Sequence, residues 1–352
     1  MTARPGLFDP LKIGDLVLPN RILMAPLTRC RAGASRIPNA MMAKYYAQRA
    51  SAGLILTEAT IVSAMGAGYA GTPGIWSTAQ VEGWKLTTRA VHAAGGRVFL
   101  QLWHVGRISH PMFLDGALPL APSAIAPKGR VSHVRPETAY VTPRPLESRE
   151  IPLVIAQFRQ GAENAERAGF DGVELHGANG YLIDQFLQDS TNHRTDDYGG
   201  SIENRARFML EAVDAAISVW GPSRVSVHLA PRGDAHDMGD SSAPATFGYV
   251  ARELGRRGIA LLCVREHLGE GRIGPALKAA FGGVYVANEG FTRETGEQVL
   301  AAGEADAVAY GKLFIANPDL PRRFALGAAL NRWTSATFYT AGAEGYTDYS
   351  AL

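Results

Sequence analysis

Two stretches decide the fold class: FDGVELH at Phe170–His176 and SIENRARFMLEAVDAAISVW at Ser201–Trp220. The first has a largely apolar interior, which is typical of a β-strand that is covered on both faces. The second places Ala206, Met209 and Val213 on one helical face, with charged residues elsewhere, which is typical of an amphipathic helix. Together they predict a strand of a parallel sheet followed by a helix that covers it.

The same strand–helix unit recurs along the whole chain. Seven further apolar runs are predicted strands, near Arg21–Pro26, Gly53–Thr60, Arg97–His104, Arg224–Pro231, Ile259–His267, Gly283–Asn288 and Asp306–Phe314. A capping box at Ser77 and Gln80 starts one of the helices between them, and Gly95-Gly96 ends it. Eight strands alternating with about eight helices predict an α/β fold, a single (β/α)8 TIM barrel over residues 1–352. A doubly wound sheet is the alternative, but eight unbroken units favour closure.

Two segments are predicted additions to the barrel. PLKIGDL at Pro10–Leu16 is typical of a hairpin ahead of the first strand, where it would plug the bottom of the barrel. Between the third and fourth strands, residues of about 105–149 form an insertion with seven prolines between Pro111 and Pro145. So many prolines predict an irregular excursion rather than a second domain. A helix is predicted after it, at Pro152–Ala168.

Composition excludes several classes of protein. The 352 residues carry 35 Lys and Arg against 33 Asp and Glu, so a net charge of +2 gives no reason to expect a nucleic-acid or membrane partner. Two cysteines, Cys30 and Cys263, exclude a disulfide scaffold, a four-cysteine zinc site and a four-cysteine iron–sulfur cluster, and no metal is expected. The longest uncharged stretch, Ala59–Val81, contains Gly, Ser, Thr and Pro and is a poor membrane span. We therefore expect a cytoplasmic protein.

One motif is misleading. Residues Gly66–Gly71 match the dinucleotide fingerprint G-x-G-x-x-G. The fingerprint binds a pyrophosphate only where its glycines turn a strand directly into a helix. Here the first glycine comes six positions after the end of the preceding strand, and Thr72-Pro73-Gly74 follows the motif, so a loop is predicted.

The most informative cluster is His176-Gly-Ala-Asn179-Gly-Tyr181, which begins where the fourth strand ends. Barrel enzymes keep their active sites at this end of the strands. An imidazole and an amide three residues apart can both donate to one oxygen and so stabilise negative charge on it. The Tyr181 phenol is a candidate proton donor to a nearby carbon. The alternative is that His176 and Asn179 cap a loop and that Tyr181 packs against it.

Other strand ends carry polar residues too. Thr28 follows the first strand, Gln101 and Trp103 share one face of the third, and Asn288-Glu289-Gly290 and Gly311-Lys312 follow the seventh and eighth. The loops after strands seven and eight commonly bind phosphate in barrels. A buried glutamine needs a polar partner, such as the edge of a heterocycle. A hydrogen bond in the barrel core for Gln101 and a plain surface position for Lys312 are the alternatives.

These residues lie in motifs that resemble the Old Yellow Enzyme flavoproteins, nearest to the N-ethylmaleimide and xenobiotic reductase branch. The resemblance runs almost end to end, through MAPLTRCR, GYAGTPGIWS, QLWHVGR, HGANGYLIDQFLQDSTNHRTDDYGGSIENR and FYTAGAEGYTDY. It implies a barrel enzyme that binds FMN non-covalently, takes electrons from NADPH or NADH and reduces activated C=C bonds. It also implies hydride transfer from flavin N5 to Cβ of the alkene and a proton from Tyr181 to Cα.

The resemblance also assigns roles residue by residue. It implies that the cofactor is bound by Ala25, Pro26, Leu27, Thr28, Ala59, Gln101, His176, Asn179, His228, Asn288, Glu289, Gly290, Gly311, Lys312 and Tyr339. It implies that the substrate is bound by Thr28, Tyr69, Trp103, His176, Asn179 and Tyr181, of which His176, Asn179 and Tyr181 are catalytic.

The sequence departs from the family pattern at several of these positions. His228 and Lys312 stand where the family usually has arginines, so the charge near flavin N1 is an open question, and Arg232 is a candidate to compensate. The family branch with a redox-tuning cysteine has it where this chain has Thr28, and Cys30, two residues on, is expected to face the other way.

The expected substrates are small electrophilic alkenes, namely α,β-unsaturated carbonyls and maleimides, with nitrate esters and nitroaromatics as further candidates. A monomer or a homodimer is expected. A related 2,4-dienoyl-CoA reductase is excluded because its iron–sulfur cluster needs cysteines that this chain lacks. The alternative from another class is a flavin-binding sensor or carrier without turnover, although binding alone does not require a proton donor.

Overall fold

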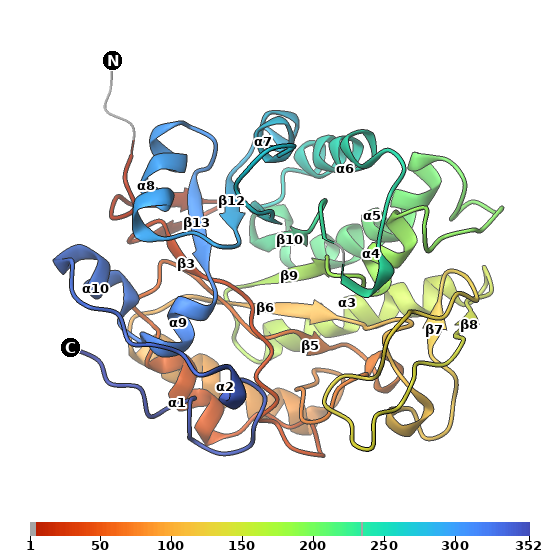
Figure 1. The fold of residues 1–352 in the computed structure, drawn as a ribbon, viewed down its shortest axis with the longest axis horizontal. Coiled ribbons are helices and arrows are strands. Elements are labelled where there is room, and N and C mark those ends of the chain that lie inside the picture. The colour runs from red at the N-terminus through yellow and green to blue at the C-terminus, as the bar shows by residue number, and fades with distance from the viewer. Residues whose placement is uncertain (1–4, 234) are drawn as a thin grey trace.

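Eight parallel strands close into a ring that helices surround (Figure 1). The computed structural model describes residues 5–233 and 235–352. The ring consists of β3 (Ile22–Met24), β4 (Ile55–Leu56), β6 (Val98–Trp103), β9 (Gly172–Gly177), β10 (Val225–Leu229), β11 (Leu261–Arg265), β12 (Tyr285–Asn288) and β13 (Ala307–Tyr310). Pairing of β13 with β3 closes it, and β5 (Thr60–Ile61) adds to β6. The predicted TIM barrel is confirmed.

Helices connect successive strands and cover the outside of the ring. They are α1 (Ala40–Ala47), α2 (Thr78–Ala93), α3 (Ile151–Arg167), α4 (Leu182–Leu187), α5 (Ile202–Trp220), α6 (Ala243–Arg257), α7 (Gly274–Phe281), α8 (Arg293–Ala301), α9 (Lys312–Ala316) and α10 (Leu320–Leu326). Short 3₁₀ turns are η1 (Ala64–Gly66), η2 (Pro111–Phe113), η3 (Pro222–Arg224), η4 (Ala235–Asp237) and η5 (Ser335–Thr337). No helix of the described residues combines the length and the apolar character that crossing a membrane requires.

Local sequence signals explain where these helices begin and which face they bury. The predicted capping box is present at α2, where the Ser77 side chain accepts from the Gln80 backbone N–H and Gln80 accepts in return. Ser201 caps α5 by accepting from the backbone N–H of Asn204, and α5 buries Met209 and Val213 against the barrel as predicted. The glycine-rich segment Gly66–Gly71 does not lead from a strand into a helix, which confirms the prediction of a loop.

Two predicted strands differ from the observed ones. The run Gly53–Thr60 contains two short strands, β4 and the start of β5, because the chain leaves the ring between Leu56 and Thr60. The run Asp306–Phe314 was too long: β13 ends at Tyr310, and helix α9 begins at Lys312. Leu313 and Phe314 are apolar like the strand and favour one long run, although Gly311 and the charged Lys312 mark the change from strand to helix.

The two predicted additions are both present. Antiparallel strands β1 (Leu11–Ile13) and β2 (Leu16–Leu18) form the N-terminal hairpin. Its buried side chains pack with inward-facing residues of the barrel, such as Leu54 and Phe99, so the hairpin closes the bottom. Segment 105–149 carries η2 and the two-stranded sheet of β7 (Leu120–Ala121) and β8 (Arg144–Pro145), at the right of Figure 1.

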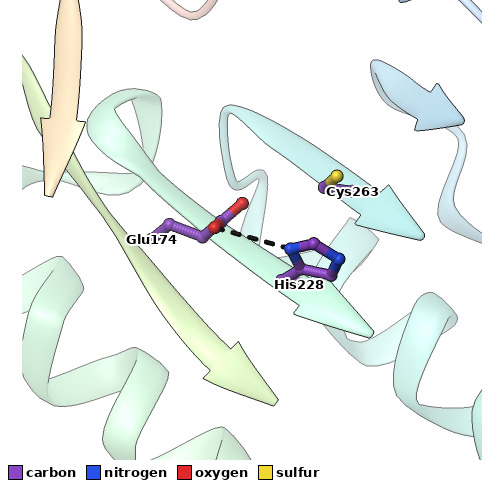
Figure 2. A group of neighbouring side chains, drawn as sticks. All are labelled: Glu174, His228 and Cys263. Atoms are coloured by element: carbon purple, nitrogen blue, oxygen red, sulfur yellow. Dashed lines mark ion pairs between the residues drawn. The ribbon is translucent and has the colours of Figure 1, made fainter. Parts of the chain in front are cut away.

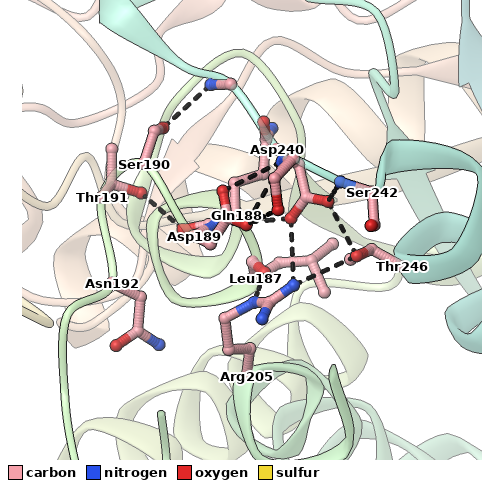
Figure 3. A network of polar contacts seen from close by, with 12 residues as sticks. Leu187, Gln188, Asp189, Ser190, Thr191, Asn192, Arg205, Asp240, Ser242 and Thr246 are labelled. Atoms are coloured by element: carbon pink, nitrogen blue, oxygen red, sulfur yellow. Dashed lines mark hydrogen bonds and ion pairs between the residues drawn. The ribbon is translucent and has the colours of Figure 1, made fainter. Parts of the chain in front are cut away.

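A buried polar network anchors α4, the helix that follows the fourth barrel strand (Figure 3). Arg205 of α5 donates to the carbonyl oxygen of Leu187 at 2.9 Å and to the carboxylate of Asp240 at 3.1 Å. Asp240 also accepts from the Thr246 hydroxyl of α6. Both members of the Arg205–Asp240 pair are almost completely buried. This network therefore ties the C-terminal end of α4 to the outer helices α5 and α6.

Candidate active site at the carboxyl ends of the barrel strands

A cavity of about 740 Å³ opens at the carboxyl ends of the barrel strands. Its lining includes the predicted residues Ala25, Pro26, Leu27, Thr28, Ala59, Tyr69, Gln101, His176, Asn179, Tyr181, His228, Asn288, Glu289, Gly290, Gly311, Lys312 and Tyr339. These residues are up to about 300 positions apart in the sequence. The barrel brings them together because all of its strands point the same way.

Trp103 is the one predicted site residue that is not part of this lining. It is buried behind the cavity wall, where its ring stacks on Tyr69 at 5.6 Å and meets Tyr181 edge-on at 4.9 Å, measured between centroids. Its place in the structure is that of a support for the two tyrosines.

His176 lies at the end of β9 with a ring that is held neutral. Burial, followed by the charges of His228 and Arg265, lowers its pKa well below the usual 6.5. The backbone N–H of Ala178 donates to Nδ1 at 3.4 Å, so Nε2 is the nitrogen that carries the proton of the neutral ring. His176 can therefore act as a single N–H donor toward the cavity.

A tight turn after His176 places Asn179 and Tyr181. Asn179 adopts a left-handed backbone with φ of 59°, which asparagine tolerates better than most residues. The buried carboxylate of Asp184 accepts from the backbone N–H of Gly180 at 2.8 Å, and Gln185 donates to the Gly180 carbonyl at 2.7 Å. The first turn of α4 thus holds the loop, so the two side chains are fixed relative to His176.

Tyr181 keeps its phenol proton at neutral pH. Burial raises its pKa above the usual 10, since the phenolate would lose its hydration. Its hydroxyl lies 3.0 Å from the hydroxyl of Tyr69, and its ring meets the ring of His176 edge-on. Tyr181 is therefore a neutral acid beside the imidazole donor.

Gln101 and His228 line the floor of the cavity, and Figure 2 shows Glu174 next to His228. Gln101 donates from Nε2 to Glu174 at 2.7 Å, and Nδ1 of His228 lies 3.7 Å from the same carboxylate. Both ring nitrogens of His228 and the other oxygen of Glu174 are buried without a hydrogen-bond partner. Unpartnered buried polar atoms are costly, so this floor is suited to a polar ligand above it.

Cys263 lies beside Glu174 and His228, with ligand atoms of all three within 4.8 Å of one another. Burial raises the pKa of the Cys263 thiol well above its usual 9, which disfavours the thiolate that a metal would bind. His228 lines the cavity while Cys263 lies beneath it. The group is therefore better matched to the edge of a heterocycle than to a metal ion.

The residues present fit FMN. Gln101 and the unpartnered His228 offer hydrogen bonds to a flat polar ring, and Pro26 and Leu27 offer an apolar wall. At the other end of the lining, a Cβ on Gly311 would lie 3.3 Å from Leu27, so the backbone approaches closely there. Lys312 lines the same end and makes no ion pair among the described residues, which leaves its charge available to a phosphate.

Two predictions about neighbouring residues are wrong. Cys30 lines the cavity, as Thr28 does, instead of facing away, and its backbone is left-handed with φ of 58°. Burial raises its pKa to about 12, so it remains an unreactive thiol. Arg232 does not line the cavity, and its nearest acid is Glu266 at 3.9 Å, so it does not compensate for His228.

Several residues of the lining are not predicted from the sequence, among them Arg265, His267, His133, Trp333 and Phe338. Arg265 is the last residue of β11, and a charged residue at the carboxyl end of a barrel strand is a signal that was available. His133 comes from segment 105–149 and contacts Tyr339, with ring centroids 4.3 Å apart. No local pattern predicts such a contact between distant loops.

The barrel, its neutral donors and its polar floor define a flavin-dependent oxidoreductase. A family model described as "NADH:flavin oxidoreductase / NADH oxidase family" matches residues 6–331. The chain belongs to this family, and the predicted relationship to the Old Yellow Enzyme is confirmed. It is an FMN-dependent enzyme that uses NAD(P)H to reduce activated C=C bonds.

Similar proteins span the full chain. 12-Oxophytodienoate reductase 1 of Oryza sativa subsp. japonica is 45% identical, over 98% of this chain and 93% of its own length. The structure of a morphinone reductase matches with 47% identity and a TM-score of 0.95, over 99% of this chain and 97% of that one. The Old Yellow Enzyme homologue from Zymomonas mobilis matches with 44% identity and a TM-score of 0.97, over 99% and 100%.

Proposed function

We propose that residues 1–352 act as one FMN-binding barrel domain in which His176, Asn179 and Tyr181 are the catalytic residues. The observation that supports this most is their placement within one strand end and one turn, facing a single cavity. The neutral state of both ionisable members supports it further, because a donor and an acid are both needed in protonated form.

His176 and Asn179 bind the carbonyl oxygen of the substrate. Nε2–H of His176 and the amide of Asn179 both donate, and negative charge that develops on the oxygen is stabilised by them. Because His176 is neutral, it donates without presenting a full charge. This arrangement polarises the C=C bond that is conjugated with the carbonyl group.

Tyr181 donates a proton to Cα. Its raised pKa keeps the proton on the phenol until it is needed, and the hydroxyl of Tyr69, 3.0 Å away, can stabilise the oxygen that is left behind. Trp103 packs against both rings and keeps them in place. Tyr69 and Thr28 complete the wall on the substrate side.

The remaining residues of the lining would hold FMN. Gln101 and His228 would bind its ring edge, Pro26, Leu27 and Thr28 would contact the ring, and the backbone of Glu289 and Gly290, with Gly311 and Lys312, would bind its phosphate. FMN, when bound, supplies a hydride that it has received from NAD(P)H. Lys312 provides one point charge where an arginine would bind phosphate through two hydrogen bonds.

The proposed substrates are α,β-unsaturated carbonyl compounds and maleimides. Support comes from relatives that are named as reductases of 12-oxophytodienoate and morphinone. Nitrate esters and nitroaromatics are further candidates, since a hydride donor in an open cavity reaches them as well.

Steady-state oxidation of NADPH that depends on added cyclohexenone tests the function. A flavin-binding sensor would instead show a single stoichiometric reduction.

The purified protein should be yellow and should release FMN on denaturation. The reason is the set of ring-binding and phosphate-binding residues that line one cavity, including Gln101, His228 and Lys312. Chromatography of the released flavin against FMN and FAD standards checks this. FAD, or no flavin after reconstitution, would contradict the assignment of these residues.

Phenols should bind the oxidised FMN-loaded enzyme as phenolates on His176 and Asn179 and give a long-wavelength charge-transfer band, because two donors stabilise the charged form. Their affinity should not depend on the charge of His176. We expect the dissociation constant, calculated for the phenolate alone, to stay constant from about pH 6 to about pH 9. The pKa of His176 lies well below 6.5, so the ring is already neutral throughout this range. Titration of the charge-transfer band of the FMN-loaded enzyme with para-chlorophenol measures it. A ring that titrated near 6.5 would instead lose phenolate affinity as the pH rose through that value.

A further inference from the structure

Arg265 lies at the mouth of the cavity with all three of its nitrogens engaged. It is the last residue of β11, on the same inward face as Cys263, and it is half-buried. Nε and Nη2 each donate to the carboxylate of Glu289 at 2.8 Å. Nη1 donates to Oδ1 of Asn179 at 2.7 Å. When a carboxylate accepts two hydrogen bonds from one edge of a planar guanidinium, the direction of the remaining N–H groups is fixed.

This contact determines which way the Asn179 amide faces. A guanidinium has five N–H donors and no acceptor, so the amide atom that meets it must be the oxygen. The NH₂ group of Asn179 then lies on the other side of the amide, and Asn179 lines the cavity. Without Arg265, the two amide orientations would differ much less in energy, and one of them presents an oxygen lone pair to the ligand.

The backbone of Asn179 is held by other groups. Nδ1 of His236 is 2.8 Å from the Asn179 carbonyl oxygen, and Asp184 accepts from the next backbone N–H, that of Gly180. Loss of the Arg265 side chain therefore leaves the turn in place and removes the constraint on the amide alone. The carboxylate of Glu289, whose backbone φ is 98°, serves as the second anchor for the guanidinium.

We propose that Arg265 is a positioning residue that fixes Asn179 as a hydrogen-bond donor toward the substrate oxygen. The inference rests on the proposed function, in which Asn179 binds that oxygen. Glu289, assigned to the cofactor through its backbone, acquires a second role through its side chain, because it holds Arg265 in the required direction. Arg265 itself acts through Asn179 and does not touch the reacting atoms.

A double-mutant cycle on the FMN-loaded enzyme tests the proposal, with para-chlorophenol as the probe. Arg265→Met should weaken phenol binding about tenfold, the lower end of the range for a hydrogen bond to a charged group. The phenol affinity of Arg265→Lys should lie between those of the parent and of Arg265→Met. A lysine ammonium can donate to one of the two acceptors, Glu289 or Asn179, but lacks the planar guanidinium that donates to both. Asn179→Ala should also weaken binding, and Arg265→Met should cause no further loss in that background. Arg232→Met, which removes a rim arginine outside the cavity lining, is the matched control and should bind like the parent.

The arms of the experiment separate two kinds of failure. The positioning role is overturned if Arg265→Met binds phenol as tightly as the wild type. It is also overturned if Arg265→Met causes the same loss of phenol affinity in the Asn179→Ala background as in the parent. Both outcomes leave oxygen binding by Asn179 intact. Wild-type affinity in Asn179→Ala overturns the proposed function of that residue, and the inference about Arg265 with it. If Arg265→Met does not retain FMN, Glu289→Gln replaces it in the double-mutant cycle, because a neutral amide binds the guanidinium more weakly than a carboxylate does.

Discussion

Replacement of His176 by alanine should slow the reduction of cyclohexenone by roughly 10²–10³-fold, the range for loss of one donor from an oxygen-binding pair. The neutral ring donates through Nε2, and no other described side chain on β9 can take its place at the oxygen. The same variant should bind para-chlorophenol more weakly and lose most of its charge-transfer band. Stopped-flow re-oxidation of the reduced enzyme and an absorbance titration measure the two effects.

His176→Asn and His92→Ala make this comparison specific. Asparagine restores an N–H donor near the lost position, so it should recover part of both the rate and the phenol affinity. His92 of α2 pairs with Asp171 at the opposite end of β9, and its loss should leave both quantities unchanged. Wild-type phenol affinity in His176→Ala would show that another group binds the oxygen.

The fold could be predicted from the sequence because the signals that determine it are local and repeated. Buried parallel strands read as apolar runs, and helix caps such as Ser77 and Gln80 mark where the chain turns outward. Boundaries are predicted less well where apolar residues resume shortly after a strand, as they do after Gly311-Lys312. Hydrophobicity reports burial, and the strand that ends at Tyr310 and the helix residues Phe314, Ile315 and Ala316 are all buried.

The cavity could be predicted in outline from strand ends, but its electrostatics could not. His176, Asn179 and Tyr181 are adjacent in the chain, so their convergence is a local property. The ion pair between Glu289 and Arg265 joins the last residue of β11 to a left-handed residue just after β12, and no pattern within either segment predicts the other. Cys30 lies beyond β3, which ends at Met24, so alternation along that strand does not determine which way Cys30 faces.

Replacement of Tyr181 by phenylalanine should separate the two half-reactions. Transfer of hydride from NAD(P)H to the enzyme needs no proton from the protein to carbon, so this rate should stay close to that of the parent. Reduction of cyclohexenone needs the proton at Cα, and general acid catalysis is worth about 10²–10⁴-fold, so this rate should fall by that factor. Nitroaromatic substrates, whose reduction does not need protonation at carbon, should be affected much less.

The dependence on pH gives an independent check on the same residue. Burial raises the pKa of Tyr181 above 10, and an acid with a raised pKa keeps its proton to higher pH. We therefore expect that deprotonation of Tyr181 does not lower the rate of alkene reduction by the parent enzyme up to about pH 9. A decline in this range that is absent from Tyr181→Phe would contradict this. Tyr198→Phe, which removes a phenol that is hydrogen-bonded to Glu211 outside the cavity, is the matched control.

Equal losses of rate in both half-reactions of Tyr181→Phe would mean that Tyr181 only packs or positions. The proton would then reach Cα from water or from a neighbour such as Tyr69, 3.0 Å away.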